Sequence, residues 1–299
     1  MMSQYPHNQY MLNPAFGGSR EVLSLYGSYR YQWVGAPFPP TFQVFTAHAP
    51  LKNENVALGG LVYSEQFGNQ EFGVYQGTKI NMSYTYRIIT ASENKIAFSL
   101  NPGVKFSNYG KLDVDFEQQD DDVLNELGIL ESDPRFGLGF GLSWYGNNFF
   151  FGISFFDFFY RTPFDPDAAF FTIGRTPILI TGGYLFHVSE IFKFQPSALV
   201  NIVSDKITIK DKPDSKYFTS VADISLTGII ADMLWVGFTY RTNKEVIGMA
   251  GWQIIPQMRA TFSYDFPTGD LKKFNAGSLE VSIQYDFGYK IMTASPKFF

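Results

Sequence analysis

Few residues in this chain have the types and spacing that catalysis or metal binding requires. The three histidines, His7, His48 and His187, lie in unrelated segments, and the chain has no cysteine, which excludes disulfides and thiolate metal sites. No Gly-x-Ser-x-Gly elbow occurs, and no spacing pairs a serine or an aspartate with a histidine. We therefore expect no catalytic residue, no cofactor and no zinc site. A barrel enzyme of the omptin or phospholipase kind is kept as a third, weaker alternative.

One acidic run offers the hard oxygen ligands that Ca²⁺ prefers. It comprises Asp113, Asp115, Glu117, Asp120, Asp121 and Asp122. The plainer interpretation is a solvated loop in which Asp120 to Asp122 cap a short helix over residues 123–130. A calcium site within Asp113–Asp122 is thus a weak hypothesis. The net charge of −5, from 23 basic and 28 acidic residues, argues against a nucleic-acid partner.

The clearest regular element is the stretch 279–287, Leu-Glu-Val-Ser-Ile-Gln-Tyr-Asp-Phe. Side chains alternate across a strand, so this stretch has one apolar and one polar face. The alternation recurs at 22–34 and 258–266. It is typical both of a soluble sandwich and of a membrane barrel.

About fourteen strands are predicted. They fall near 22–34, 41–50, 55–65, 72–87, 93–106, 136–144, 149–156, 175–187, 191–203, 216–228, 232–242, 246–255, 258–266 and 275–287. The 27 glycines and 18% aromatic residues agree with this β-rich interpretation. Within 136–144, large residues alternate with Gly137, Gly139, Gly141 and Ser143, which indicates a crowded lumen or a close backbone approach.

The connections decide between the two β architectures. Every connection from an even to an odd strand is short, whereas the long ones, 107–133, 157–174, 204–215 and 267–274, all follow odd strands. Short turns at one end and long loops at the other are typical of outer-membrane barrels. A barrel of fourteen strands also encloses more space than apolar side chains can fill. The chain has no run of about 18 apolar residues, so no transmembrane helix is predicted. The sequence therefore predicts an all-β, transmembrane, antiparallel up-and-down barrel with short periplasmic turns and long external loops.

We expect three parts along the chain: a periplasmic N-terminal segment at 1–20, the barrel at 21–288 and a periplasmic C-terminal tail at 289–299. An even strand count places both termini on the periplasmic side. The N-terminal segment either plugs the lumen or simply leads into the first strand. No signal peptide precedes it, and we expect one to have been cleaved.

Two sets of residues are candidates for function. Those predicted to face the lumen are Arg30, Gln32, Arg259, Glu280, Gln284 and Asp286, either as a salt-bridge network, which we favour, or as an anion-preferring pore. Candidate partner contacts are Val123, Leu124, Leu127, Phe159, Phe164, Phe170, Phe171, Pro296, Phe298 and Phe299. Two alternatives remain for Val123, Leu124 and Leu127 and for the Phe-rich loop at 155–171: they contact a partner, or they fold over the barrel mouth.

Four blocks resemble the PorP/SprF family. They are the N-terminal Gln9-Tyr10-Met11-Leu12-Asn13-Pro14-Ala15-Phe16-Gly17-Gly18-Ser19, then Arg30-Tyr31-Gln32-Trp33-Val34-Gly35, the last hairpin at 263–266 and 271–280, and the ending Ser295-Pro296-Lys297-Phe298-Phe299. The resemblance implies an outer-membrane barrel of the Bacteroidota that serves type IX secretion. It also implies large secreted surface proteins, including gliding adhesins, as partners. The alternative function is a small-solute channel or transporter, suggested by the polar inner face.

Overall fold

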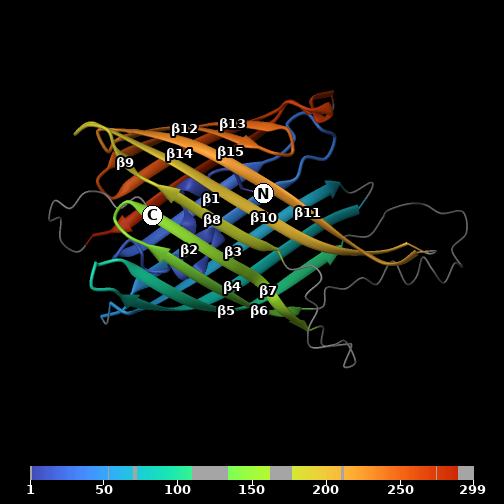
Figure 1. Cartoon of the computed structure of the whole chain (residues 1–299). Coiled ribbons are helices and arrows are strands. Elements are labelled where there is room, and N and C mark those ends of the chain that lie inside the picture. Colours follow the sequence, from blue (N-terminus) through green and yellow to red (C-terminus); the bar gives the residue numbers. More distant parts are fainter. Residues whose placement is uncertain are drawn as a thin grey trace, which may run out of the picture.

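A computed structural model describes residues 2–52, 54–69, 73–109, 134–161, 177–209, 212–273 and 275–288. Antiparallel strands form one sheet that closes on itself (Figure 1). The strands are β1 (Leu23–Tyr31), β2 (Thr41–Pro50), β3 (Val56–Asn69), β4 (Gly73–Ile89), β5 (Lys95–Tyr109), β6 (Arg135–Tyr145), β7 (Phe149–Arg161), β8 (Ile178–Tyr184), β9 (Phe186–His187), β10 (Phe192–Ile209), β11 (Lys212–Ile230), β12 (Leu234–Arg241), β13 (Glu245–Ile255), β14 (Met258–Pro267) and β15 (Ser278–Phe287). The described helical elements are η1 (Tyr5–His7), α1 (Gln9–Leu12), η2 (Pro14–Phe16) and η4 (Asp270–Lys273).

The predicted barrel of about 14 strands is confirmed. β8 and β9 both pair with β10 and form one interrupted strand, so the closed barrel has 14 strands. Pro196 lies in β10 between the residues that pair with β8 and those that pair with β9. Because proline has no backbone N–H, it cannot donate to the ladder there, which accounts for the interruption.

The first and last strands close the barrel. β15 pairs with β1 from Leu23 opposite Phe287 to Tyr31 opposite Leu279. With β8 and β9 counted as one strand, every strand pairs with the next one in sequence, including β10 with β11. The pairing of β15 with β1 therefore makes the ring continuous.

Burial alternates along the strands as the sequence pattern predicts. In β12 every second residue is exposed, and those between are buried. Val281 and Ile283 in β15 are 42% and 56% exposed on the outer side, as expected for residues that face lipid. β15 has 10 residues, which matches the length of a tilted membrane-spanning strand.

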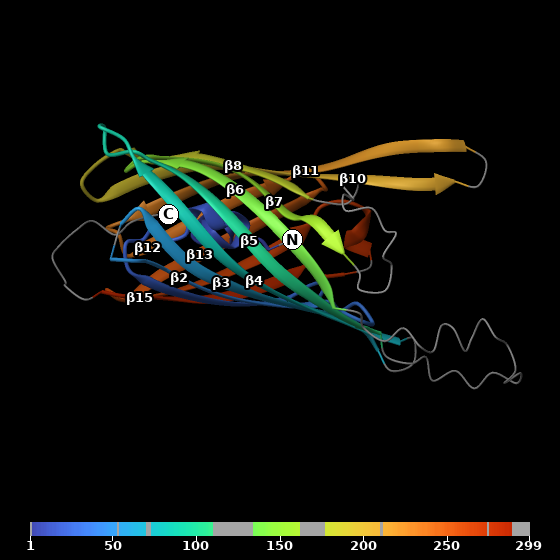
Figure 2. The same ribbon diagram turned by 90° about the horizontal axis from the view of Figure 1, so that it is seen from below.

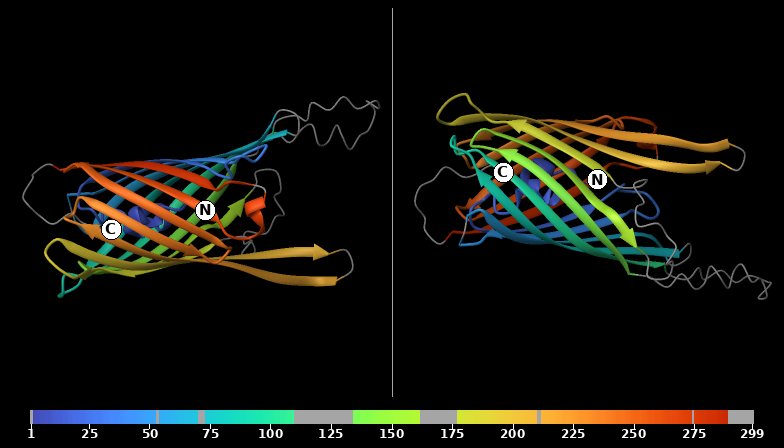
Figure 3. Two further views of the ribbon diagram at one scale, coloured as in Figure 1. Left: turned by 90° about the horizontal axis from the view of Figure 1, so that it is seen from above. Right: turned by 60° about the horizontal axis from the view of Figure 1, so that its bottom comes forward.

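The connection pattern holds with one correction. Residues 110–133 and 162–176, which lie outside the described part of the chain, join β5 to β6 and β7 to β8, at the end opposite the short turns. The predicted loop at 204–215 is wrong, because β10 continues to Ile209 and β11 begins at Lys212. The β10 residues after Ile202 and the β11 residues before Asp223 pair with each other and not with β8 or β12. The hairpin that they form projects past the barrel rim (Figures 2 and 3). Its polar composition made an extended hairpin hard to distinguish from a loop.

In the described part of the chain, no helix has the length and apolar character needed to cross a membrane.

Candidate functional site

The N-terminal segment lies inside the barrel. Every residue from 2 to 19 is buried, and the helices that it forms are visible between the walls (Figure 3). Two asparagines cap these short helices: Asn8 Oδ1 accepts from the Met11 backbone N–H at 3.2 Å, and Asn13 Oδ1 accepts from that of Ala15 at 3.0 Å. We call residues 2–19 the plug.

Hydrogen bonds join the plug to strands around the whole circumference, which is possible only from within. The bonds run from Gln4 to Thr261 of β14 and to Glu280 of β15, from Tyr5 to Ser225 of β11, from Asn8 to Thr46 of β2, from Thr85 of β4 to Pro14, from Asn13 to Leu142 of β6 and Ile153 of β7, and from Thr181 of β8 to Gln9. Buried polar groups need such partners, and here the wall and the plug satisfy each other. Of the two interpretations of this segment, the structure therefore shows the plug.

Two glycines on the inner face make room for the plug. A Cβ at Gly59 would overlap the Tyr10 hydroxyl, and a Cβ at Gly141 would overlap Asn13 Oδ1. The alternation of glycine with large residues in β6 predicted a crowded lumen or a close backbone approach, and the approach of Asn13 to Gly141 confirms it. A glycine allows this closeness because it has no side chain.

Beside Ser3 lies a buried ionic cluster of two arginines and four carboxylates. It consists of Arg30, Asp223, Arg241, Glu245, Asp265 and Glu280. Arg30 donates to Asp265 at 2.6 Å and to Glu280 at 3.3 Å. Arg241 donates to both oxygens of Asp223, at 2.8 and 2.9 Å. Removing one partner from such a buried network typically costs about 3–5 kcal/mol, because the other charge is left uncompensated.

The plug takes part in this cluster. The Ser3 hydroxyl donates to Asp265 at 2.7 Å and accepts from Arg30 at 2.8 Å, while the Ser3 backbone N–H donates to Glu280 at 2.7 Å. One residue of the plug thus contacts charges from β1, β14 and β15. The cluster anchors the plug to the wall, since its carboxylates are engaged by the arginines and by Ser3.

The other predicted lumen residues lie nearby. Arg259, itself buried, donates to Gln284 Oε1 at 2.5 Å and to the His7 carbonyl at 3.3 Å, and it lies 5.0 Å from the Trp235 ring centroid. Asp286 accepts from Arg20 at 3.2 Å. Gln32, just beyond β1, is half-buried, and its Oε1 lies 3.5 Å from Arg30 Nε.

Burial changes the proton affinity of the plug's side chains. It lowers the pKa of His7 well below its ordinary value, and the cations Arg259 and Arg20 lower it further. Burial also raises the pKa of Tyr5 and of Tyr10 to about 12. The plug is therefore held by neutral side chains near neutral pH.

Sequence reasoning missed much of the cluster. Alternation places Asp265 and Arg241 on polar strand faces, but Asp223, Glu245 and Ser3 are not among the residues predicted to face the lumen. A search for charged residues at inward positions of neighbouring strands would have found the carboxylates. Ser3 has no such signal, because its position depends on how the plug folds back into the barrel.

The predicted partner contacts Val123, Leu124, Leu127, Phe164, Phe170, Phe171, Pro296, Phe298 and Phe299 lie outside the described residues, and so does the acidic run Asp113–Asp122. Phe159 lies in β7, where the structure describes the backbone alone. Within the described ranges, no three His, Asp or Glu side chains are grouped so as to hold a metal ion.

A family model described as "Type IX secretion system membrane protein PorP/SprF" matches residues 1–285, which confirms the resemblance of the N-terminal and last-hairpin blocks. No curated protein matches the sequence.

Solved membrane barrels share the fold. The CymD monoaromatic hydrocarbon channel has a TM-score of 0.55 at 13% identity, with 95% of this chain and 93% of that chain covered. The Ralstonia pickettii toluene transporter TbuX has a TM-score of 0.54 at 9% identity, with 93% of each chain covered. The P. putida toluene transporter TodX has a TM-score of 0.52 at 8% identity, with 95% of each chain covered. At these identities the likeness is one of fold.

Proposed function

Because the chain belongs to the PorP/SprF family of type IX secretion system membrane proteins, we propose that it supports the secretion or cell-surface anchoring of a large type IX-secreted protein. A gliding adhesin in one of the Bacteroidota is the kind of partner that we expect. The protein acts as a non-enzymatic barrel in the outer membrane. The solved structures that share its fold are channels and transporters.

The plug is the observation that carries this proposal. A lumen occupied by residues 2–19, hydrogen-bonded to strands on every side, favours a barrel that binds other proteins over one that conducts solutes. A partner would then meet the protein at the ends of the barrel. We propose that the long-connection end faces outward and that the chain enters β1 and leaves β15 on the periplasmic side, with residues 2–19 folded back into the lumen from that side.

The candidate contact regions are Val123, Leu124 and Leu127, the Phe-rich stretch at 155–171 and the tail at 289–299. Apolar clusters beyond a membrane barrel often mark partner surfaces. Deleting residues 289–299 should leave the barrel assembled and impair the partner's display, if the tail is a periplasmic contact.

The experiment is a deletion of the gene, followed by quantification of a candidate type IX-secreted adhesin on the surface of intact cells with a labelled antibody. We expect adhesin display to be lost and to return when the full-length chain is supplied. Pull-down from detergent-solubilised membranes of the complemented strain should recover the adhesin or type IX components. Unchanged display in the deletion strain would contradict the proposal.

A small-solute channel is the alternative, and the polar inner face of the wall is the observation in its favour. The plug opposes it, and the hydrocarbon channels of similar fold are too distant in sequence to assign their substrates to this chain. Conductance in planar bilayers separates the two functions.

A further inference from the structure

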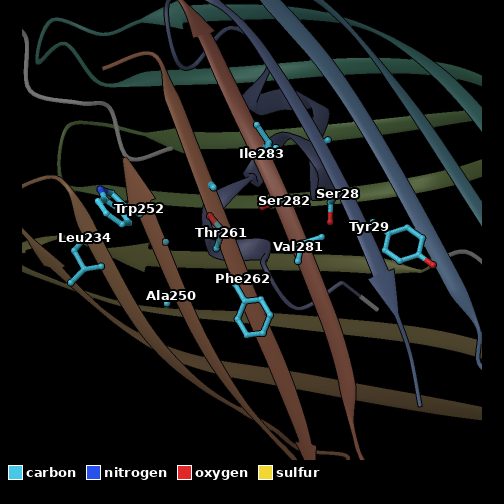
Figure 4. Close-up of a pocket in the computed structure, with 13 residues that line it drawn as sticks. Ser28, Tyr29, Leu234, Ala250, Trp252, Thr261, Phe262, Val281, Ser282 and Ile283 are labelled. Carbon is cyan, nitrogen blue, oxygen red and sulfur yellow. The ribbon is translucent and has the colours of Figure 1, made fainter. Parts of the chain in front are cut away.

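The outer wall of the barrel carries an apolar groove of about 750 Å³ across β12, β13, β14, β15 and β1 (Figure 4). Small residues form its floor: Gly27, Ala250 and Ala260. A Cβ at Gly27 would meet no atom within 4 Å, so the space in front of it is open. Large side chains stand around this floor, among them Tyr29, Leu234, Trp252, Phe262 and Ile283.

The groove is part of the surface that faces lipid. Ala260 is opposite Trp252 on one side and Ile283 on the other, and Ile283 is opposite Gly27. Trp252 and Ile283 are 63% and 56% exposed, on the same side of the wall as the rest of the apolar band. The groove is therefore continuous with the interface between the barrel and the bilayer, and a soluble protein cannot reach it.

The groove offers an occupant almost no hydrogen-bond partner. The backbone groups of the five strands pair within the closed sheet. Ser28 and Ser282 also line the groove, but their hydroxyls point inward and donate to Glu280 and to Gln4 of the plug. A peptide lying here would leave its own N–H and C=O groups unsatisfied in hydrocarbon, which is strongly unfavourable.

A second copy of the chain fits the groove poorly. In a two-fold contact through this face, the same patch of both subunits would meet, so one concavity would face the other. The resulting void would forfeit the packing that stabilises an interface. A linear hydrocarbon chain needs no polar partner and conforms to an open groove.

We propose that this groove is a binding site for one acyl chain of a membrane phospholipid, which stays on the barrel while the surrounding lipids exchange. Because hydrocarbon already surrounds the groove, the affinity comes from close packing of the chain's methylenes against the Gly27, Ala250 and Ala260 floor, and the large side chains around the floor limit lateral exit.

Native mass spectrometry of the full-length protein, reconstituted with palmitoyl-oleoyl phosphatidylethanolamine and then transferred to detergent, tests the proposal. The wild type should retain one phospholipid. The variant A260F fills the floor, removes these packing contacts and should retain roughly tenfold less lipid, a loss of about 1.4 kcal/mol in binding free energy. The matched control is A47F, since Ala47 faces outward on β2, opposite Leu25 and Gly60, and outside the groove. A47F should retain lipid as the wild type does.

A second measurement does not depend on how A260F folds. Dibrominated phosphatidylcholine, titrated into wild-type protein in detergent, should quench the fluorescence of Trp252 and saturate near one lipid per protein. The signal of Trp252 is obtained as the difference between the wild type and the W252F variant. Equal lipid retention by A260F and the wild type would overturn the proposal. Equal losses of lipid in A260F and A47F, or quenching that does not saturate, would also overturn it. A lipid-free dimer that the A260F substitution dissociates would overturn it too, because it would assign the groove to a second copy of the chain.

Discussion

At the scale of single residues, the fit between wall and plug depends on positions where a side chain has no space. Gly59 faces inward, where a methyl group would overlap the Tyr10 hydroxyl. Gly60, its neighbour, faces outward, and a methyl group there would have one ordinary contact, with the Asn81 carbonyl at 3.7 Å. A glycine-to-alanine substitution changes the strand propensity at both positions, but only at Gly59 does it also disturb the packing of the plug. Comparing the two substitutions therefore isolates the contribution of plug packing to stability.

We expect Gly59→Ala to destabilise the barrel by about 1–3 kcal/mol, the usual cost of overpacking, while Gly60→Ala stays near the wild type. Urea unfolding in lipid vesicles, followed by tryptophan fluorescence, measures both. Adding Tyr10→Phe to Gly59→Ala should recover part of the loss, since it removes the overlapping hydroxyl. Equal effects at the two glycines would contradict this account.

The charged residues show how far sequence reasoning reaches at this scale. Alternation along β1 and β15 puts Arg30 and Glu280 on polar strand faces, and register then brings them opposite each other. That Arg30 also contacts Asp265 and Ser3 follows from the curvature of the closed sheet and from the plug, neither of which is a local property of the chain.

At the scale of elements, the plug cannot be stable on its own. Its three helical elements have three, four and three residues, far below the length at which an isolated helix persists in water. Its structure is imposed by the wall, so any change that weakens wall contacts should release it as a unit.

Acidification is one such change. Burial and the neighbouring Arg259 and Arg20 lower the pKa of His7, so the docked plug binds fewer protons than the released plug. Docking should thus be strongest above the ordinary histidine value of about 6.5 and weaken as the pH falls below it. Hydrogen exchange of amides in residues 2–19 should accelerate between about pH 7.5 and about pH 5.5, after correction for the intrinsic rate. The H7Q variant should lose the part of this dependence that His7 contributes, while His48, which accepts a hydrogen bond from the Gly18 backbone N–H at 3.1 Å, keeps its own contact with the plug. Unchanged protection in the wild type would refute the prediction.

At the scale of the whole molecule, the plug and the polar inner wall have opposite consequences for conduction. The wall of fourteen strands encloses a wide space, and residues 2–19 occupy its interior. The full-length protein is therefore expected to be silent in planar bilayers.

Deleting residues 2–19 should produce stable ion-conducting steps, because the polar inner face is then open to water. Heat-modifiable mobility on gels provides the folding control for the deleted protein. Conductance of the full-length chain equal to that of the deletion would favour the channel alternative over the secretion-support function.

The sequence by itself determined the strands, their outward and inward faces, the barrel class and the family. These follow from short-range patterns, namely period-two alternation, turn residues and connection lengths, which are written locally in the chain. Only the tertiary structure decided that residues 2–19 enter the lumen, that Ser3 contacts the Arg30 cluster, and that small residues from β1, β13 and β14 line one groove. Each of these depends on which side chains meet inside or on the closed barrel, and those contacts join residues far apart in sequence that no local pattern brings together.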